Sequence, residues 1–504
     1  MTQTHSNQRS RRTLVVAYVF PPAGGAGVQR VTKFVKYLPE FGWDCSVLTV
    51  ANPSVPVFDD SLADEIPEGT VVRRARTLEP GYALKNVVSA GAASESQQQP
   101  GLLSRTKRWL KQTVRNAGNA ILQPDAQILW YPAAVKEGMN LLAEQPHDAI
   151  FVTAPPFSAF VIGAELSRRS GLPLVIDYRD EWGISNRYQE NRQKSGLSHW
   201  LQNRMQRRVL RQASAIVATT RRSTESVAET ASAAGTSPKV TAIYNGYDAA
   251  DIGLPALPDN REAAADRKLR LAYVGTLWNL TSIEPIVAAL LRLEETSPEI
   301  AERIELVVAG RVTAEQGAIL DRLLATSCSV TREGYVDHAR AIEIMRSADA
   351  QCLLLSDVAE AERVVPAKTF EYLALQRPIL SIVPTGEVSE ILADCPFAAS
   401  FTPDDVAGIA RYLERRVEAE CLAGLPADEP QSLPTADWSV SRFERRHLTG
   451  ELADVLNSVC GLAPSRASEA AATPETLAPA ESTEVQPTSE DTLSLATAGT
   501  GGSS

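Results

Sequence analysis

Apolar runs of six to eight residues alternate with longer amphipathic stretches through most of this chain. The runs are continuous rather than alternating, which is typical of strands buried on both faces. The pattern predicts nine strands, five in the first half and four in the second: residues 13–20, 45–50, 149–154, 173–178, 215–220, 269–275, 304–310, 350–355 and 378–383.

Helical periodicity fills most of the gaps between these strands, for example at residues 28–38 and 282–295. Strands that alternate with helices predict an α/β fold with parallel sheets covered on both faces. A polar, proline-bearing stretch at residues 255–268 separates the two series of strands. The 504 residues are 44% hydrophobic, enough for two cores. We therefore expect two doubly wound, Rossmann-like domains.

The expected domain bounds follow from these patterns. They are a basic, disordered N-terminus at 1–12, an N-terminal domain at 13–254, a C-terminal domain at 268–435, a helix at 436–460 and a disordered tail at 461–504. The tail is rich in Ala, Thr, Ser, Pro and Glu and has too few large apolar residues to form a core.

Cysteine usage and hydropathy suggest where the protein resides. The six cysteines are scattered, without a CxxC pair or a Cys/His cluster, which favours a reducing compartment over disulfides or structural zinc. The apolar run at 14–20 is too short for a signal peptide, and no run approaches the roughly 20 residues of a membrane span. We expect a cytoplasmic protein.

The charge is unevenly distributed. Residues 1–247 hold 29 Lys and Arg against 20 Asp and Glu, whereas the remainder holds 21 against 41. A net charge of −11 without a recognition module disfavours nucleic acid. Basic amphipathic segments at Arg105–Arg115 and Arg204–Arg211 predict peripheral contact with anionic lipid at the inner membrane face. The alternative is that these are ordinary helices with a charged face in water.

The first candidate for chemistry is "VVPAKTFEYLALQRPILSIV", at residues 364–383. Pro366 suits a helix start, and Lys368 and Glu371 then share one helix face. An ammonium beside a helix N-terminus attracts phosphate, and a carboxylate one turn later accepts hydrogen bonds from a ribose diol. The pattern favours a nucleoside diphosphate ligand. An ordinary ion pair between positions three apart is the alternative.

Glycines follow several predicted strands. In "YVFPPAGGAGVQR", Gly24 and Gly25 allow close backbone approach to a ligand, but the spacing is neither a dinucleotide fingerprint nor a P-loop. Gly275 and Gly310 end two strands of the second series, Gly310 being followed by the cation Arg311. Tight turns would explain such glycines equally well.

"DYRDEW", residues 177–182, places two carboxylates and a guanidinium at the end of a strand, where ligands of such sheets bind. Asp177 or Asp180 can orient an acceptor hydroxyl, and Arg179 can pair with a phosphate or with either acid. The alternative is a self-satisfied Asp–Arg–Asp ion network.

Six motifs in register resemble GT-B glycosyltransferases of the group 1/family 4 type: "PPAGGAGVQR", "YNGYD", "YVGTL", "VVAGR", "EGYVDH" and "VPAKTFEYLALQRPIL". "TAPPFSA", "DYRDEW" and "PDAQILWYP" resemble a subgroup of surface-polysaccharide assembly. The resemblance implies two domains facing across a cleft, with the donor held by the C-terminal domain, the acceptor by the N-terminal domain, and a C-terminal helix returning to the N-domain.

The site expected from the residues and the resemblance together has three parts. The donor-binding residues are Gly24, Gly25, Gly275, Thr276, Arg311, Tyr335, Val336 and Glu371; the catalytic residues are Lys368, Arg179 and Asp180; the acceptor-binding residues are Arg30 and Asp177. The resemblance places Glu371 at the donor ribose and Tyr335 and Val336 beside the nucleobase.

The implied function is retaining transfer of a sugar from a UDP-, GDP- or other nucleoside-diphosphate sugar to a lipid-linked or polysaccharide glycan, without a metal or a cofactor. The sequence departs from the family at three places. Arg363 stands where the first glutamate of the paired acidic motif is expected, Trp278 and its neighbours replace a basic loop, and the cleft histidine is missing. A nucleotide-sugar hydrolase or epimerase, or a silent nucleotide- or partner-binding member, are the alternatives.

Overall fold

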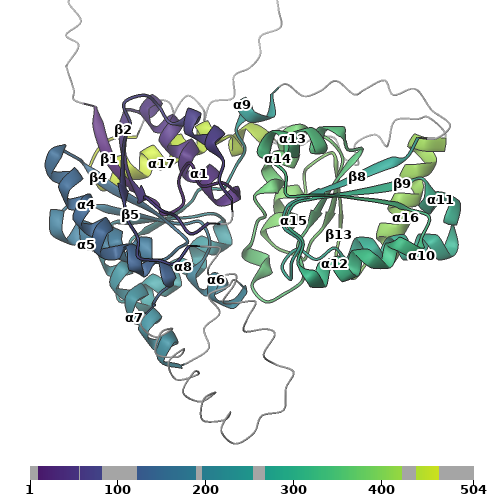
Figure 1. The fold of residues 1–504 in the computed structure, drawn as a ribbon, viewed down its shortest axis with the longest axis horizontal. Helices are drawn as coiled ribbons and strands as arrows, with labels where there is room; N and C mark the ends of the chain where they lie inside the picture. Colours follow the sequence, from purple (N-terminus) through teal and green to yellow (C-terminus); the bar gives the residue numbers. More distant parts are fainter. Residues whose placement is uncertain are drawn as a thin grey trace, which may run out of the picture.

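The computed structural model describes residues 10–55, 57–81, 122–188, 196–253, 267–422 and 439–464. They form two α/β domains that lie side by side, each built on one parallel sheet (Figure 1). The predicted fold class is confirmed. Most of the predicted N-terminus (1–12), linker (255–268) and tail (461–504) lies outside the described residues. The first strand begins at Arg11, inside the stretch predicted to be disordered.

The N-terminal sheet has seven strands in the order β3-β2-β1-β4-β5-β6-β7. Their bounds are β1 Arg11–Val16, β2 Trp43–Val50, β3 Val71–Ala75, β4 Ala149–Ala154, β5 Leu174–Tyr178, β6 Ala215–Ala218 and β7 Lys239–Ala242. The strand order reverses beside β1, between β2 and β4, which is where ligands of doubly wound sheets bind.

Helices cover both faces of this sheet because successive side chains of each strand point to opposite sides. Leu14 and Val16 pack with α4, α5 and α7, whereas Val15 packs with α1 and α17. The helix bounds are α1 Ala26–Tyr37, α4 Tyr131–Glu144, α5 Ser158–Ser170, α6 Trp182–Tyr188, α7 Gly196–Gln212, α8 Arg221–Ala233 and α9 Ala249–Ile252.

The C-terminal sheet has six strands in the order β10-β9-β8-β11-β12-β13. Their bounds are β8 Leu269–Val274, β9 Ile304–Ala309, β10 Ser329–Gly334, β11 Ala350–Leu354, β12 Ile379–Ile382 and β13 Ala398–Phe401. Helices α10 Glu284–Thr296, α11 Pro298–Glu302, α12 Ala314–Asp321 and α16 Val406–Val417 pack on one face. Helices α13 His338–Ser347, α14 Lys368–Leu375 and α15 Glu387–Leu392 pack on the other.

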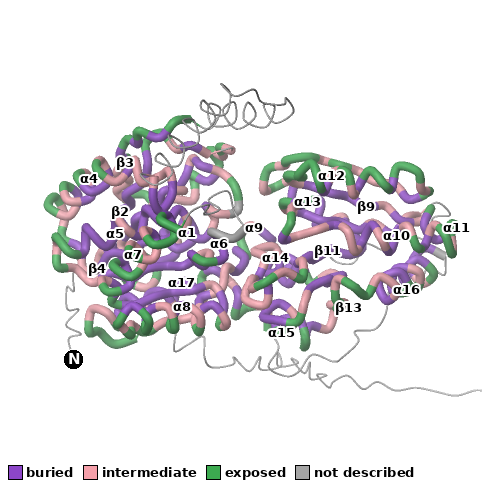
Figure 2. The backbone as a smooth tube through the Cα atoms, turned by 90° about the horizontal axis from the view of Figure 1, so that it is seen from below, coloured by how far each residue is buried: buried purple, intermediate pink, exposed green. Residues whose placement is uncertain are grey.

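The last described helix, α17 (Arg445–Val459), returns from the C-terminal domain and packs on α1 (Figures 1 and 2). Its Asn457 accepts a hydrogen bond from the buried indole of Trp43 at 3.0 Å. A 3-10 turn, Val440–Phe443, precedes α17, so the helix begins later than the predicted residue 436. None of the described helices is long and apolar enough to cross a membrane.

The nine predicted strands correspond to the nine internal strands of the two sheets. The pattern missed β3, β7, β10 and β13, which are the four edge strands. An edge strand has one neighbour and is only partly buried, so its sequence is mixed: β7 reads KVTA and β10 reads SVTREG. These edge strands lack the continuous apolar run that predicts a strand buried on both faces.

Gly310, at the end of β9, provides a test of this architecture. A Cβ atom built there would lie 1.9 Å from the carbonyl oxygen of Gly275, and its φ is +128°. We expect Gly310→Ala to lower the free energy of unfolding by about 2–4 kcal/mol because the backbone of two strand ends must separate. Denaturant unfolding measures this loss. Gly317→Ala, in α12 with no atom within 4 Å, is the matched control and should stabilise the protein or leave it unchanged.

Candidate active site

The carboxyl ends of β8, β9 and β10 meet at a backbone-rich surface of the C-terminal domain. Gly310 N donates to Gly334 O at 2.6 Å, and Gly275 N donates to Ala309 O at 2.9 Å. The absence of side chains at the glycines lets these strand ends approach closely. Two predicted donor residues, Thr276 and Arg311, lie exposed directly after these ends. The guanidinium of Arg311 has no hydrogen-bond or ion-pair partner among the described residues.

Lys368 and Glu371 lie together at the start of α14, as their spacing predicted. They form an ion pair, and their side chains are 23% and 15% exposed. Phe370, between them in sequence, is buried against Tyr244 and Phe443, with ring centroids 5.9 and 5.0 Å apart. Because Tyr244 follows the last strand of the N-terminal sheet, this start of α14 lies at the junction of the two domains.

Two glycines of the first loop are held by the chain that follows β2. Gly24 N donates to Val57 O at 3.0 Å, and Asp59 N donates to Pro22 O at 2.8 Å. Gly25 precedes α1 with φ +95°, a conformation that side chains disfavour. The loop containing Gly24 and Gly25 is therefore fixed at the carboxyl end of the N-terminal sheet.

Tyr335 directly follows β10 of the C-terminal domain, and its side chain is 52% exposed. Burial raises the pKa of the phenol, and the negative charges of Asp59 and Asp337 raise it further. Asp59 belongs to the N-terminal segment that holds Gly24, so its charge acts on Tyr335 from the other domain. The donor-binding roles of Tyr335 and Val336 remain predictions.

Arg30 and Asp177, predicted to bind the acceptor, instead bind each other. Arg30 Nη2 and Asp177 Oδ1 are 2.8 Å apart, and the two side chains are 1% and 0% exposed. Arg30 also donates to Tyr244 O at 2.7 Å, and Thr153 donates to Asp177 at 2.7 Å. The prediction is wrong for these two residues, because full burial leaves neither side chain accessible to an acceptor. They join α1 to the ends of β4 and β5.

Arg179 was expected either to act at the site or to form an ion network with Asp177 and Asp180, but its guanidinium mainly binds backbone carbonyl groups. Its guanidinium donates to the carbonyl oxygens of Gly27 and, at 3.0 Å, of Pro155. Burial lowers the pKa of Arg179, and Arg30 contributes to the lowering, whereas Asp180 and Asp177 oppose it. Arg179 therefore fixes the start of α1 against the β4–α5 turn. Its catalytic role and that of the half-buried Asp180 remain predictions.

A buried charge cluster in the N-terminal domain was not predicted from the sequence. Lys33 is 0% exposed, and its ammonium lies 2.7 Å from Asp248 and 2.9 Å from Asp251, with Glu65 as a third partner. Burial acts to raise the pKa of Asp248, but Lys33 outweighs it and lowers that pKa to about 2. In the described part of the chain these three carboxylates are the one group close enough to share a metal ion, and Lys33 supplies the positive charge among them.

A buried carboxylate of the C-terminal domain contacts the start of α8 in the N-terminal domain. Glu387, at the start of α15, is fully buried and accepts hydrogen bonds from the backbone N–H groups of Arg221 and Arg222, each at 3.1 Å. These N–H groups are the free donors at the start of α8, which favour an anion. Tyr244 O–H also donates to Glu387. We call this contact of Glu387 with α8 the interdomain latch.

Arg363 forms a second interdomain contact. It occupies the position of the first family glutamate, and its guanidinium lies 3.2 Å from Glu181 of the N-terminal domain and 3.1 Å from Glu360. Thr220 donates to the carbonyl oxygen of Arg363 at 3.0 Å. The replacement therefore puts a cation that connects the two domains where the family resemblance leads one to expect a carboxylate.

The buried Arg30–Asp177 pair generates a stability prediction. Arg30→Met leaves Asp177 buried without its cation, and we expect a loss of about 3–5 kcal/mol in the free energy of unfolding. The double variant Arg30→Met with Asp177→Asn removes both charges and should recover part of that loss. Urea unfolding of the three proteins measures the difference. A single variant as stable as wild type would show that the pair is not as buried as the structure has it.

The interdomain latch predicts a pH dependence. Burial acts to raise the pKa of Glu387, but hydrogen bonds from Tyr244, Arg221 and Arg222 outweigh it and lower the pKa below 4.5. A lowered pKa contributes stability above pH 4.5 that is lost as the pH falls through the folded-state value. We expect Glu387→Gln to cost about 1.5–3 kcal/mol at pH 7 and progressively less below pH 4.5.

Thermal unfolding of wild type and Glu387→Gln between pH 7 and pH 3.5 checks this dependence. Glu390→Gln is the matched control, because Glu390 lies on the same helix and pairs with the same arginines but is 42% exposed. We expect that control to change stability by less than about 1 kcal/mol. A gap between wild type and Glu387→Gln that stays constant with pH would contradict the latch.

Comparison with known proteins supports the two-domain fold. Residues 24–246 match the model of the glycosyl transferase 4-like domain. HepE of Anabaena, solved with UDP, is 14% identical, with 89% of this chain and 100% of that chain covered and a TM-score of 0.53. Sucrose-phosphate synthase of Thermosynechococcus elongatus is 13% identical, with 89% and 96% covered and a TM-score of 0.53.

A glycosyltransferase of Rickettsia africae is 11% identical, with 90% of this chain and 99% of that chain covered and a TM-score of 0.53. No curated protein sequence matches the chain significantly. The resemblance to group 1/family 4 glycosyltransferases is confirmed at the level of the fold: the chain has the two-domain GT-B glycosyltransferase fold, and residues 24–246 match the glycosyl transferase 4-like model.

Proposed function

We propose that the protein is a retaining glycosyltransferase that moves a sugar from a nucleoside-diphosphate sugar to a glycan acceptor. The observation that carries the proposal is the position of Lys368 and Glu371, which pair at the start of α14 where the two domains meet. A cation and a carboxylate at a helix start suit a diphosphate and a ribose diol, respectively. The glycines at the ends of β8 and β9 leave backbone accessible to the same ligand.

The donor would be held by the C-terminal domain. Lys368 and Arg311 would neutralise the diphosphate, with backbone N–H groups near Gly275 and Thr276 as further donors. Glu371 would accept hydrogen bonds from the ribose, and Tyr335 with Val336 would lie beside the base. HepE of Anabaena has been solved with UDP and with UDP-glucose, so UDP-glucose is the first donor to test.

Catalysis would rest on positioning and electrostatics rather than on a metal or a cofactor. Negative charge develops on the leaving diphosphate, and Lys368, Arg311 and the start of α14 stabilise it. The approach of Tyr335 to the glycine loop would exclude water that hydrolyses the donor. On the acceptor side, Asp180 stands at the end of β5 and is the candidate to orient the attacking hydroxyl.

The acceptor we propose is a lipid-linked or polysaccharide glycan, handled on the cytoplasmic side of a membrane. The N-terminal domain carries the acceptor in this arrangement, because its sheet presents its carboxyl end to the cleft. Peripheral contact with the inner membrane face would bring the enzyme to a lipid-linked acceptor.

A second candidate is a member that binds nucleotide or a partner without turnover. The ion pair between Arg363 and Glu181 favours it, because the first glutamate of the family's paired acidic motif is replaced by a cation that pairs with the other domain. Binding of UDP or GDP without sugar transfer across an acceptor panel would support this candidate. Release of free sugar from labelled donor without any acceptor would support a hydrolase on the same fold.

Variants of the α14 pair test the proposed donor site. We expect UDP or GDP to raise the melting temperature of wild type by mass action. Glu371→Ala should weaken nucleotide binding at least about 10-fold because a hydrogen bond to a charged group is lost. Lys368→Ala should lower kcat about 100-fold or more, as expected when one charged group that stabilises the transition state is removed.

Glu343→Ala is the matched control for this experiment. Glu343 pairs with Arg340 three residues earlier in α13, so the substitution breaks a pair of the same spacing on a neighbouring helix. Nucleotide titration by calorimetry and transfer assays with labelled donor give the two readouts. Wild-type binding and wild-type transfer in both α14 variants would refute the assignment.

A further inference from the structure

One face of α7 exposes both apolar and basic side chains. Leu197 and Trp200 are each 58% exposed, although they are large and apolar. At 100° per residue, both fall on the same side of the helix as Arg204, Arg208 and Arg211. The opposite side of α7 is buried against the N-terminal domain through Val209 and Leu210. We call the exposed side, with Arg207, the α7 face.

The α7 face is strongly basic. The helix contains no acidic residue, and its arginines at 204, 207, 208 and 211 are all exposed. The neighbouring helix α5 adds Arg168 and Arg169, whose side chains are 54% and 47% exposed. Glu165 alone faces these cations from α5 and pairs with three of them. The arginines therefore outnumber the carboxylate, and the surface carries a net positive charge.

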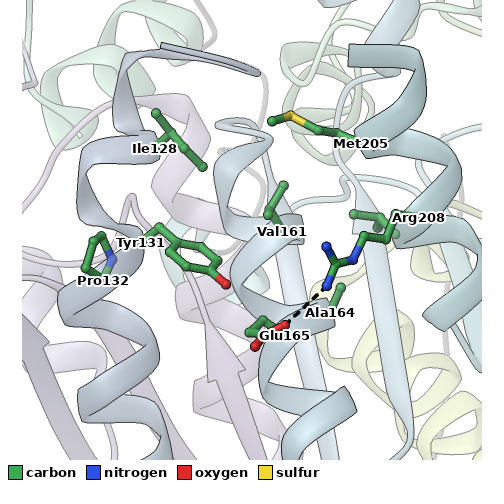
Figure 3. Close-up of a pocket in the computed structure, with 9 residues that line it drawn as sticks. Ile128, Tyr131, Pro132, Val161, Ala164, Glu165, Met205 and Arg208 are labelled. Carbon is green, nitrogen blue, oxygen red and sulfur yellow. Dashed lines mark hydrogen bonds and ion pairs between the residues drawn. The ribbon is translucent and has the colours of Figure 1, made fainter. Parts of the chain in front are cut away.

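An apolar cavity opens beside the α7 face, between α4, α5 and α7 (Figure 3). Its volume is about 280 Å³, and it is lined by Ile128, Tyr131, Pro132, Val161, Ala164, Glu165, Met205, Arg208 and Val209. Figure 3 shows Arg208 and Glu165 paired at one side of the cavity, with Ile128, Val161 and Met205 forming an apolar end. Arg208 thus belongs both to the cavity and to the α7 face.

The cavity has mostly apolar walls, with the Arg208–Glu165 ion pair at one side. Hydrogen bonds from Arg168 and Arg169 outweigh burial and lower the pKa of Glu165 to about 2, so Glu165 stays ionised and neutralises one arginine. The remaining cations favour an anionic group beside the apolar space. A volume just below the roughly 300–1,000 Å³ of ligand sites suits a single hydrocarbon chain better than a glycan.

We propose that the α7 face and the adjoining cavity bind the surface of an anionic lipid bilayer, with Leu197 and Trp200 entering the interface and one lipid chain occupying the cavity. Aromatic and aliphatic residues beside arginines are typical of interfacial helices. Residues 97–124 contain cations and no acid, so repulsion between like charges disfavours that segment as the occupant. Only the purpose of this site, which is access to a lipid-linked acceptor, rests on the proposed function.

Vesicle flotation of the full chain tests the proposal without donor or turnover, so its failure is distinct from failure of the transferase assignment. We expect binding to phosphatidylcholine vesicles that contain 30% phosphatidylglycerol, and little binding to pure phosphatidylcholine. The double variant Leu197→Ser with Trp200→Ser should bind about 20-fold more weakly through the loss of two inserted side chains. Arg204→Gln with Arg207→Gln should lose about 20-fold, at roughly fivefold per cation.

Two variants separate this surface from general electrostatics. Arg411→Gln with Arg415→Gln makes the same charge change on exposed residues of α16, in the C-terminal domain, and should bind like wild type. Trp200→Phe keeps an apolar ring and should also retain binding. Equal binding to neutral and anionic vesicles, or equal losses in the α7 and α16 variants, would overturn the proposal.

The cavity is tested by filling it. Val161→Phe places a ring among the lining residues and leaves every arginine in place, so we expect about a fivefold loss of binding to anionic vesicles. A short-chain phosphatidylglycerol below its micellar concentration should raise the melting temperature of wild type and not of Val161→Phe, whereas inorganic phosphate should act equally on both. If filling the cavity changes neither readout, the chain-binding part of the proposal is wrong.

Discussion

The structure depends on the buried contact between Arg30 and Asp177, which ties three segments of the N-terminal domain to the domain junction. Thr153 and Asp177 end neighbouring strands, and Arg30 connects them to α1 and, through its second nitrogen, to the carbonyl oxygen of Tyr244. The hydroxyl of Tyr244 then donates to Glu387 of the C-terminal domain. A continuous chain of charge-assisted hydrogen bonds thus runs from one sheet to the other domain. Removing any charged member leaves a buried partner unpaired, which lowers the free energy of unfolding.

This network explains why the cleft carries so few free charges on its N-terminal side. Arg179 is used to hold Gly27, Arg30 is paired with Asp177, and Lys33 is surrounded by carboxylates. The exposed cation and backbone groups are concentrated instead after β8 and β9, in the C-terminal domain. In the function that we propose, a diphosphate would therefore be attracted to the C-terminal domain. The Arg363–Glu181 pair adds a contact between the two domains at the position where the first glutamate of the paired acidic motif is expected.

The sequence predicted what depends on local pattern and missed what depends on distant partners. Internal strands are continuous apolar runs and were found, whereas edge strands such as β7 carry mixed side chains and were not. Lys368 and Glu371 were placed correctly because their relation is three positions on one helix. Asp177 was assigned to an acceptor because its partner stands 147 residues earlier in the sequence. Neither Glu387 nor Lys33 could be identified from the sequence, since a lone charge in an amphipathic helix is expected to be exposed. The partners that bury them are distant in sequence: the start of α8 for Glu387, and Glu65, Asp248 and Asp251 for Lys33.

The opposite net charges of the two halves of the sequence form ion pairs at the domain junction. Acidic residues of the second half meet cations of the first half there, as Glu387 and Glu390 do with Arg221 and Arg222. These pairs favour the assembled arrangement of the domains because each half would otherwise repel itself more strongly. The arginines of α5 and α7 are not consumed in this way, since they lie on the far side of the N-terminal sheet from α1 and α17. The C-terminal domain does not neutralise this excess of positive charge, so it can attract an external anion. An anionic bilayer fits both features in our proposal, because its surface is negatively charged and its apolar interior matches the cavity beside Arg208.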